Sequence, residues 1–282
     1  MNFMHTFKRI GGGIVILISA LFLSCALFES STEEEADSAE IARVRKILAE
    51  RKWIIHAGGL IQDESGTEYS YTNSFDALNQ CFALGNTVSE IDFRISSDNC
   101  LVCTHEWNMM SKNGVETPNE KMTKEEFLQC QTKGGFTSMW LGDLVDFLKK
   151  HNDFYFVTDI KDNNIDGCRI IRDFCPEWKD HFIIQIYHAS EYDEIRALGF
   201  KNIIYTLYAT TEKERDVQTL INFAKTHKLL GFTYWYYWTP TYFAPFKNAN
   251  ISQYLHTVNN TTERNSYLQQ GISAIYTDVV KN

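Results

Sequence analysis

Short apolar runs alternate with segments of helical character from Lys52 to the C-terminus, and this alternation limits the fold more than any other feature of the sequence. Nine runs are typical of strands, at residues 53–56, 87–93, 100–105, 154–160, 182–187, 202–208, 229–235, 251–258 and 272–277. Helical segments lie between most of them, at residues 74–84, 141–150, 165–174, 190–197, 212–227 and 260–270. Repeated strand–helix units imply a parallel sheet with helices outside it.

The number of these units favours a closed barrel. About eight strand–helix units within residues 52–282 match the size of a (β/α)8 barrel, and an open doubly wound sheet is the alternative. The first strand leads into HAGGLIQD, which lacks the third glycine and the helix start of a dinucleotide-binding loop. Polar residues recur at the carboxyl ends of many strands, and a barrel gathers these ends around one mouth. We therefore predict an α/β fold, a single (β/α)8 barrel domain over residues 52–282, in which one of the nine runs is an addition or a misassignment.

The first 28 residues are typical of a targeting segment. Lys8 and Arg9 precede an uncharged run over residues 11–28, and an acidic polar stretch follows. FLSC, ending at Cys25, resembles the signal of a bacterial lipoprotein; the run is also just long enough for an uncleaved membrane anchor, and a cleaved signal peptide is the third possibility. We expect an exported protein at the cell surface or in the periplasm, associated with the membrane through this segment. Residues 29–51 then read as a polar tether.

The charge of the chain limits its partners. The sequence has 27 basic and 36 acidic residues, a formal net charge of −9, and shows no stretch dense in lysine and arginine. This argues against a nucleic-acid partner. An acidic protein that binds an anionic substrate needs local positive charge, such as a metal ion.

Acidic and histidine side chains follow the strand pattern. Glu90 and Asp92 are two residues apart on one predicted strand, so both side chains point to the same face, which at the top of a barrel is the mouth. Other strands carry polar residues at matching places: Asp159 with Lys161, Gln185 with Tyr187, and His56 and His105 at strand ends. Each of these residues has a structural explanation when taken alone. Their combination at successive strand ends indicates a functional site.

The residue types at this mouth indicate metal and proton chemistry. Three converging carboxylates, Glu90, Asp92 and Asp159, repel one another unless a cation lies among them. Ligands that are all oxygen suit Ca²⁺ or Mg²⁺ rather than zinc. His56 and His105 are then free for proton transfer, because imidazole titrates near neutral pH.

Other side chains near the mouth are candidates for substrate contact. Trp107 follows His105 and Glu106 directly, and we expect it at the mouth, together with Gln185 and Tyr187. The aromatic run TYWYYWTP, residues 233–240, fits a buried strand that leads into a packed loop, which we favour, or a platform for a glycerol, sugar or acyl group.

The motifs HAGG, YTNSFDAL, EIDFRISSDNCLVCTHEW, TDIK and IYTD resemble those of the glycerophosphodiester phosphodiesterase family, one of the PLC-like phosphodiesterase barrels. The HAGG…YTNS…HEW variant looks like an exported or membrane-anchored bacterial subgroup. By position, the resemblance implies that His56 and His105 are the acid/base pair and Lys161 a phosphate contact, with Glu90, Asp92 and Asp159 as metal ligands. The chain departs from the family pattern twice: Asp159 stands where the family has glutamate, and Ala57 where it has an arginine that contacts phosphate.

The resemblance implies an enzyme of lipid metabolism, a metal-dependent phosphodiester hydrolase that uses two histidines. Its substrate is then a small-molecule or lipid phosphodiester, either glycerophosphodiester-like or a phospholipid head group, and a cyclic phosphate forms that is released or hydrolysed. The alternative function is a catalytically weak barrel that binds a phospholipid head group or an envelope polymer. Ala57 and Asp159 favour this alternative, whereas the presence of both histidines opposes it.

Overall fold

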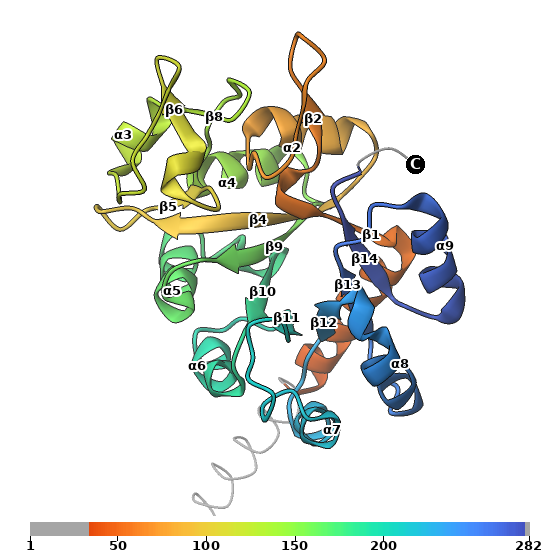
Figure 1. Ribbon diagram of the computed structural model, residues 1–282. Coiled ribbons are helices and arrows are strands. Elements are labelled where there is room, and N and C mark those ends of the chain that lie inside the picture. The colour runs from red at the N-terminus through yellow and green to blue at the C-terminus, as the bar shows by residue number, and fades with distance from the viewer. Residues whose placement is uncertain (1–33, 280–282) are drawn as a thin grey trace, which may run out of the picture. The chain divides into compact units, whose positions relative to one another are not determined.

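The computed structural model describes residues 34–279. Within them, eight parallel strands close into a ring in the order β1-β14-β13-β12-β11-β10-β9-β4, with β4 paired to β1 (Figure 1). This confirms the predicted (β/α)8 barrel. The strands are β1 (Trp53–Ile55), β4 (Val88–Ile95), β9 (Tyr155–Ile160), β10 (Phe182–Ile186), β11 (Ile203–Thr206), β12 (Gly231–Trp235), β13 (Gln253–His256) and β14 (Ala274–Thr277).

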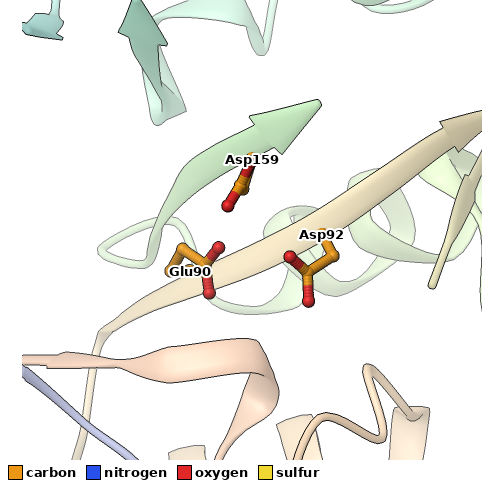
Figure 2. Close-up of side chains that lie close together, drawn as sticks. All are labelled: Glu90, Asp92 and Asp159. Atoms are coloured by element: carbon orange, nitrogen blue, oxygen red, sulfur yellow. The ribbon is translucent and has the colours of Figure 1, made fainter. Parts of the chain in front are cut away.

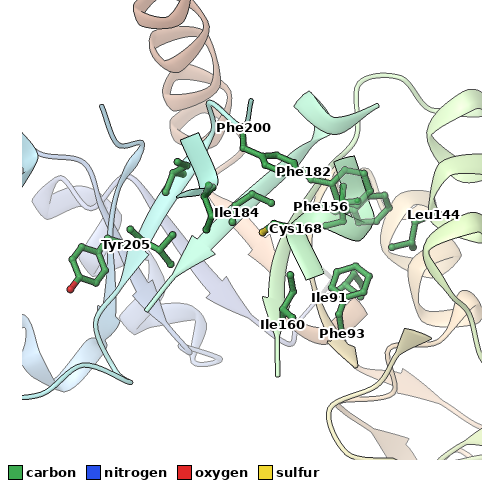
Figure 3. Packing of buried hydrophobic residues seen from close by; sticks show 14 of the residues in the cluster. Ile91, Phe93, Leu144, Phe156, Ile160, Cys168, Phe182, Ile184, Phe200 and Tyr205 are labelled. Carbon is green, nitrogen blue, oxygen red and sulfur yellow. The ribbon is translucent and has the colours of Figure 1, made fainter. Parts of the chain in front are cut away.

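Helices surround the strands (Figure 1). They are α2 (Phe75–Ala83), α4 (Leu141–Lys150), α5 (Asn164–Phe174), α6 (Tyr192–Ala197), α7 (Val217–Thr226), α8 (Thr239–Asn248) and α9 (Thr261–Gln270). Outward-facing strand residues such as Ile91 and Phe156 pack against helix residues such as Leu144 and Cys168 (Figure 3). Full burial of a large apolar side chain stabilises the fold by about 1.5–3 kcal/mol, so this layer holds the helices in place.

The predicted strand at residues 100–105 is the one that is an addition to the barrel. β5 (Leu101–Cys103) pairs with β4, but antiparallel. Beyond it lies an insertion before α4 (Figure 1), made of β6 (Met110–Lys112), β7 (Val115–Glu116), α3 (Lys124–Leu128) and β8 (Gln131–Thr132). A separate hairpin, β2 (Ile61–Gln62) and β3 (Glu68–Tyr69), follows β1.

Residues 41–51, part of a helix that was not predicted from the sequence, close the amino-terminal end of the barrel. Residues 34–51 are helical, and the side chains of Ile41, Val44 and Leu48 are buried. Their apolar cluster includes residues at or next to the starts of all eight barrel strands: Ile54, Val88, Tyr155, Ile183, Ile204, Leu230, Tyr254 and Ala274. The interval 29–51, expected to be a polar tether, therefore ends in a packed helix. The predicted targeting segment, residues 1–28, lies outside the described residues.

No helix within residues 34–279 has both the length and the apolar character that a bilayer span requires.

Candidate active site

Three carboxylates converge inside the mouth of the barrel (Figure 2). Glu90 and Asp92 lie on β4 and Asp159 on β9, all are buried, and one oxygen from each lies within 4.8 Å of the others. The two strands pair in parallel with Asp92 opposite Asp159, which explains the convergence. Burial and the charge of Asp92 raise the pKa of Glu90 to about 8. The cluster therefore has a strong need for positive charge.

One lysine supplies part of that charge. The Lys161 ammonium lies 2.7 Å from Asp159 Oδ2 and 2.8 Å from Asp92 Oδ1. Burial acts to lower the pKa of Lys161, but the charges of Asp92 and Asp159 raise it, so the amine stays protonated. Glu90 Oε1 is buried and has no hydrogen-bond partner. A buried carboxylate oxygen without a partner, among three converging carboxylates, fits the oxygen ligands that Ca²⁺ or Mg²⁺ takes.

His56 follows β1, and its ring is held by the carboxylate of Asp278, which follows β14. Its Nδ1 lies 2.7 Å from Asp278 Oδ1, and its Nε2 is 3.9 Å from Glu90 Oε2. Burial opposes protonation, but the hydrogen bond to Asp278 and the charges of Glu90 and Asp92 raise the pKa of His56 to about 9. At neutral pH the imidazole is therefore charged, with Nδ1–H donating to Asp278.

The backbone after His56 supports the carboxylate cluster. Ala57 has a φ of 49°, in the left-handed region, and its N–H donates to Glu90 Oε2 at 2.8 Å. The Ala57 side chain is fully buried. The position where the family carries an arginine therefore contributes a backbone donor here and places no positive charge at the mouth.

Asn73 holds Asp92 in the same way. Its side-chain nitrogen donates to Asp92 Oδ2 at 2.8 Å, and its oxygen accepts from the Asp92 backbone N–H at 3.0 Å. Asn73 also has a left-handed φ, 45°. This role was not predicted from the sequence: Asn73 lies in the motif YTNS, which suits a helix cap, but Ser74 makes that cap.

His105 and His56 both pack against one aromatic ring, that of Tyr71. The Tyr71 ring meets both imidazoles edge-on, with centroids 4.5 Å from His56 and 5.4 Å from His105. The His105 side chain is 34% exposed, and burial together with the charge of Lys161 lowers its pKa. The His56 side chain is only 4% exposed, and the ring of His256 also packs against it, with centroids 4.8 Å apart. Tyr71 opens the motif YTNSFDAL, but the motif did not indicate this role; its φ of 60° is rare for an aromatic residue.

Arg94, two residues after Asp92 on the same face of β4, ties the loop of His105 to the end of β9. Its Nε donates to the carbonyl oxygen of His105 at 2.9 Å, and its Nη2 donates to Glu106 Oε2 at 2.6 Å. Its Nη1 lies 3.5 Å from Asp162 Oδ1. These contacts fix the backbone that carries His105, so Arg94 is a positioning residue.

The other three residues predicted to contact substrate, Gln185, Tyr187 and Trp107, contact protein side chains instead. The Tyr187 hydroxyl donates to Asp159 Oδ1 at 2.5 Å, so it supports a carboxylate. The Gln185 side chain is buried and its amide already bonds to Thr158 and Thr206. Trp107, expected at the mouth, is 5% exposed and packs in an apolar cluster of the insertion. The indole is directed there because residues 107–109 form a short 3-10 turn after His105.

Comparison with known proteins agrees with this geometry. Residues 65–282 match the model of the glycerophosphoryl diester phosphodiesterase family. The matched segment holds the three carboxylates and His105, and His56 precedes it. A search of curated proteins gave no match.

Solved structures of phosphodiesterases share the fold. The chain is 16% identical to a glycerophosphodiester phosphodiesterase from Thermotoga maritima, over 82% of this chain and 95% of that one, with a TM-score of 0.63. A glycerophosphodiester phosphodiesterase from Parabacteroides distasonis gives 18% identity over 80% and 93%, with a TM-score of 0.62. The family match extends over most of the chain, and the barrel supports it independently. The chain therefore belongs to the glycerophosphoryl diester phosphodiesterase family and is a phosphoric diester hydrolase.

Proposed function

We propose that the protein cleaves a glycerophosphodiester-like or phospholipid head-group diester with the help of one divalent cation, Ca²⁺ or Mg²⁺, and two histidines. The observation that carries this proposal is the convergence of three buried carboxylates beside His56 and His105, which both contact the ring of Tyr71. Glu90, Asp92 and Asp159 would hold the cation. When bound, it supplies positive charge that stabilises a phosphoryl oxygen and eases deprotonation of a nearby hydroxyl.

The opposite pKa shifts of the two histidines assign their roles. His105, with a lowered pKa, is neutral at pH 7 and can accept the proton of the attacking hydroxyl. His56, with a raised pKa, is charged and can donate its Nε2 proton to the leaving oxygen, while Asp278 keeps its ring in place. Two titratable groups whose surroundings separate their pKa values form a suitable acid/base pair.

Lys161 and Tyr71 complete the contacts for the phosphoryl group. The Lys161 ammonium lies beside the carboxylates and supplies a fixed positive charge, which matters because Ala57 supplies none. Burial and the charge of Asp92 raise the pKa of Tyr71 to about 12, so its hydroxyl keeps its proton and remains a donor. Both groups would stabilise the negative charge that grows on the phosphoryl oxygens during cleavage.

Turnover of a nitrophenyl phosphodiester of glycerol, whose neighbouring hydroxyl can attack phosphorus as nitrophenolate leaves, tests this proposal. We expect the purified protein to release nitrophenol, to lose this activity when treated with a chelator, and to regain it with Ca²⁺ or Mg²⁺. Phosphorus NMR of the products of a glycerol diester distinguishes a released cyclic phosphate from a hydrolysed one. Full activity after chelation would remove the cation from the proposal. Absence of turnover with either cation would favour the alternative, a barrel that binds a head group without cleaving it.

Replacing Arg94 with methionine is expected to lower turnover by about 10–100-fold, because displacement of a supported catalytic group has effects of this size. Arg94→Lys should recover little of the turnover, since one ammonium cannot reproduce the hydrogen bonds of the guanidinium to the His105 carbonyl oxygen and to Glu106. The acidic limb of the pH–rate profile, set by His105, should move, whereas stabilisation by Ca²⁺ or Mg²⁺ should not change. Arg169→Met, on the exposed side of α5, is the matched control. An unchanged pH profile in Arg94→Met would show that the residue does not position His105.

A further inference from the structure

A continuous series of aromatic rings leads from the carboxylate cluster to the protein surface. The Tyr208 hydroxyl donates to Asp159 Oδ2 at 3.3 Å, and its ring centroid lies 5.1 Å from that of Trp235. Trp235 stacks on Tyr237, with centroids 6.0 Å apart and ring planes 9° from parallel. Trp235 ends β12 and Tyr237 follows it within a short turn, residues 236–238. The series therefore starts at the acidic cluster and ends at the surface on the same side of the barrel.

The series ends in an apolar groove. A cavity of about 640 Å³ is lined by side chains of the turn after β12, of α8 and of α9, none of them charged. Six of the eight lining residues are apolar or aromatic: Tyr236, Tyr237, Pro240, Phe243, Ala244 and Tyr267. Tyr236 and Tyr237 are 38% and 58% exposed. An exposed aromatic surface beside a polar site is typical of a binding site.

The chemistry of the lining identifies its occupant. A sugar needs several hydrogen-bonding side chains around its hydroxyls, and the groove offers only Thr239 and Gln270. None of the eight lining residues is charged, and the ammonium of Lys247 beside Phe243 already donates to the carbonyl oxygen of Gln270 at 2.8 Å, so the groove offers little to an anionic group. A hydrocarbon chain needs neither, and removing apolar surface from water favours its binding. Tyr237, which lines the groove, stacks on Trp235, and Trp235 lies against Tyr208 beside Asp159. One molecule with a polar diester at the cluster and an apolar tail along these rings therefore fits both sites.

We propose that the substrate is a phosphodiester carrying a single hydrocarbon chain, as in a lysophospholipid. Its diester lies at Glu90, Asp92 and Asp159, and its chain passes Trp235 into the groove between α8 and α9. This inference rests on the proposed function, whose substrate class it narrows. The volume of the groove is within the usual range of small-molecule sites, 300–1,000 Å³, which suits one chain.

A series of diesters that differ only in chain length tests the proposal, with every chain short enough to remain monomeric in solution. For the wild type, kcat/KM should increase by up to about fourfold per methylene until the groove is full. Ala244→Glu places a charge in the groove and should abolish this increase while leaving cleavage of the diester without a chain unchanged. Ala83→Glu, at an exposed position near the end of α2, is the matched control and should behave as the wild type.

Several results would overturn the proposal. In the first, kcat/KM of the wild type does not depend on chain length. In the second, Ala244→Glu lowers kcat/KM equally for diesters with and without a chain. A third is chain dependence only for substrate in vesicles, which would make the groove a contact for a bilayer. If no diester is cleaved, the proposed function fails but the groove is still testable. Monomeric dodecylphosphocholine should then raise the Tm of the wild type and not that of Ala244→Glu, and equal shifts would refute the groove.

Discussion

Alanine at His56 or at His105 is expected to lower turnover of a phosphodiester with an alkyl leaving group by about 10²–10⁴-fold, the usual effect of losing a positioned proton carrier. The turnover of the double variant should be little lower than that of the less active single variant, because the two histidines act in one reaction step. His188→Ala is the control, since His188 is exposed and paired with Glu214.

The leaving group distinguishes the two histidines. Nitrophenolate needs little protonation, so a nitrophenyl diester should restore much of the turnover of His56→Ala and little of that of His105→Ala. The reverse pattern would exchange the roles derived from the opposite pKa shifts. Retention of turnover near the wild-type level in both variants would exclude the two-histidine mechanism altogether.

The same assignment fixes the direction of the pH dependence. As pH falls through the lowered pKa of His105, below 6.5, the base becomes protonated and the rate should decrease. As pH rises towards 9, His56 loses its proton and the rate should decrease again. Because a cation at Glu90 repels charge on His56, the upper limb should lie at or below 9 in the loaded enzyme. An acidic limb above pH 6.5, or a rate that does not fall as pH rises past 9, would contradict the assignment.

The second large effect is expected from the carboxylates. Loss of a residue that only hydrogen-bonds to a metal ligand typically weakens metal binding by about 10–100-fold. Asp92→Asn should weaken cation binding by more than this, since it removes the charge of a proposed ligand. Millimolar Ca²⁺ or Mg²⁺ should raise the Tm of the wild type, by several degrees if the cation is present at about 100 times its Kd. The Tm of Asp92→Asn should change little, and its turnover should fall with the affinity.

Calorimetric titration with Ca²⁺ and with Mg²⁺ measures this loss without relying on activity. Asp153→Asn is the control, because Asp153 is exposed and lies outside the cluster. Equal Tm shifts in the wild type and in Asp92→Asn would place the cation elsewhere on the protein.

The strands of the barrel were predictable because each is a short apolar run buried on both faces. The run at residues 100–105 looks the same in the sequence, yet β5 pairs antiparallel with β4, since two strands joined by a tight turn return on themselves. The apolar content of a run does not indicate whether the strand pairs parallel or antiparallel with its neighbour. α8 was missed because Pro245 lies inside it, a position where proline is rare.

The site was predictable where its residues share one strand or a strand end. Glu90 and Asp92 follow from spacing alone, and the paired strands bring Asp159 beside them. Tyr71 and Asn73 come from a loop, and Asp278 from the end of the last strand. These residues approach the cluster only after the barrel closes, so no local pattern reveals their roles. Trp107 shows the converse, because adjacency to His105 does not determine where an indole points.

The helix at residues 34–51 has a consequence for the order of folding. Ile41, Val44 and Leu48 are among the first described residues to leave the ribosome, yet their cluster includes Ala274 and Tyr276 of the last strand. β1 likewise pairs with β14, and Trp53 and Ile275 are 222 positions apart (275 minus 53). Contacts between such distant residues form slowly, because a long loop must close first. The first helix and the first strand therefore lack part of their contacts until synthesis is nearly complete, and the barrel closes as a late event in folding.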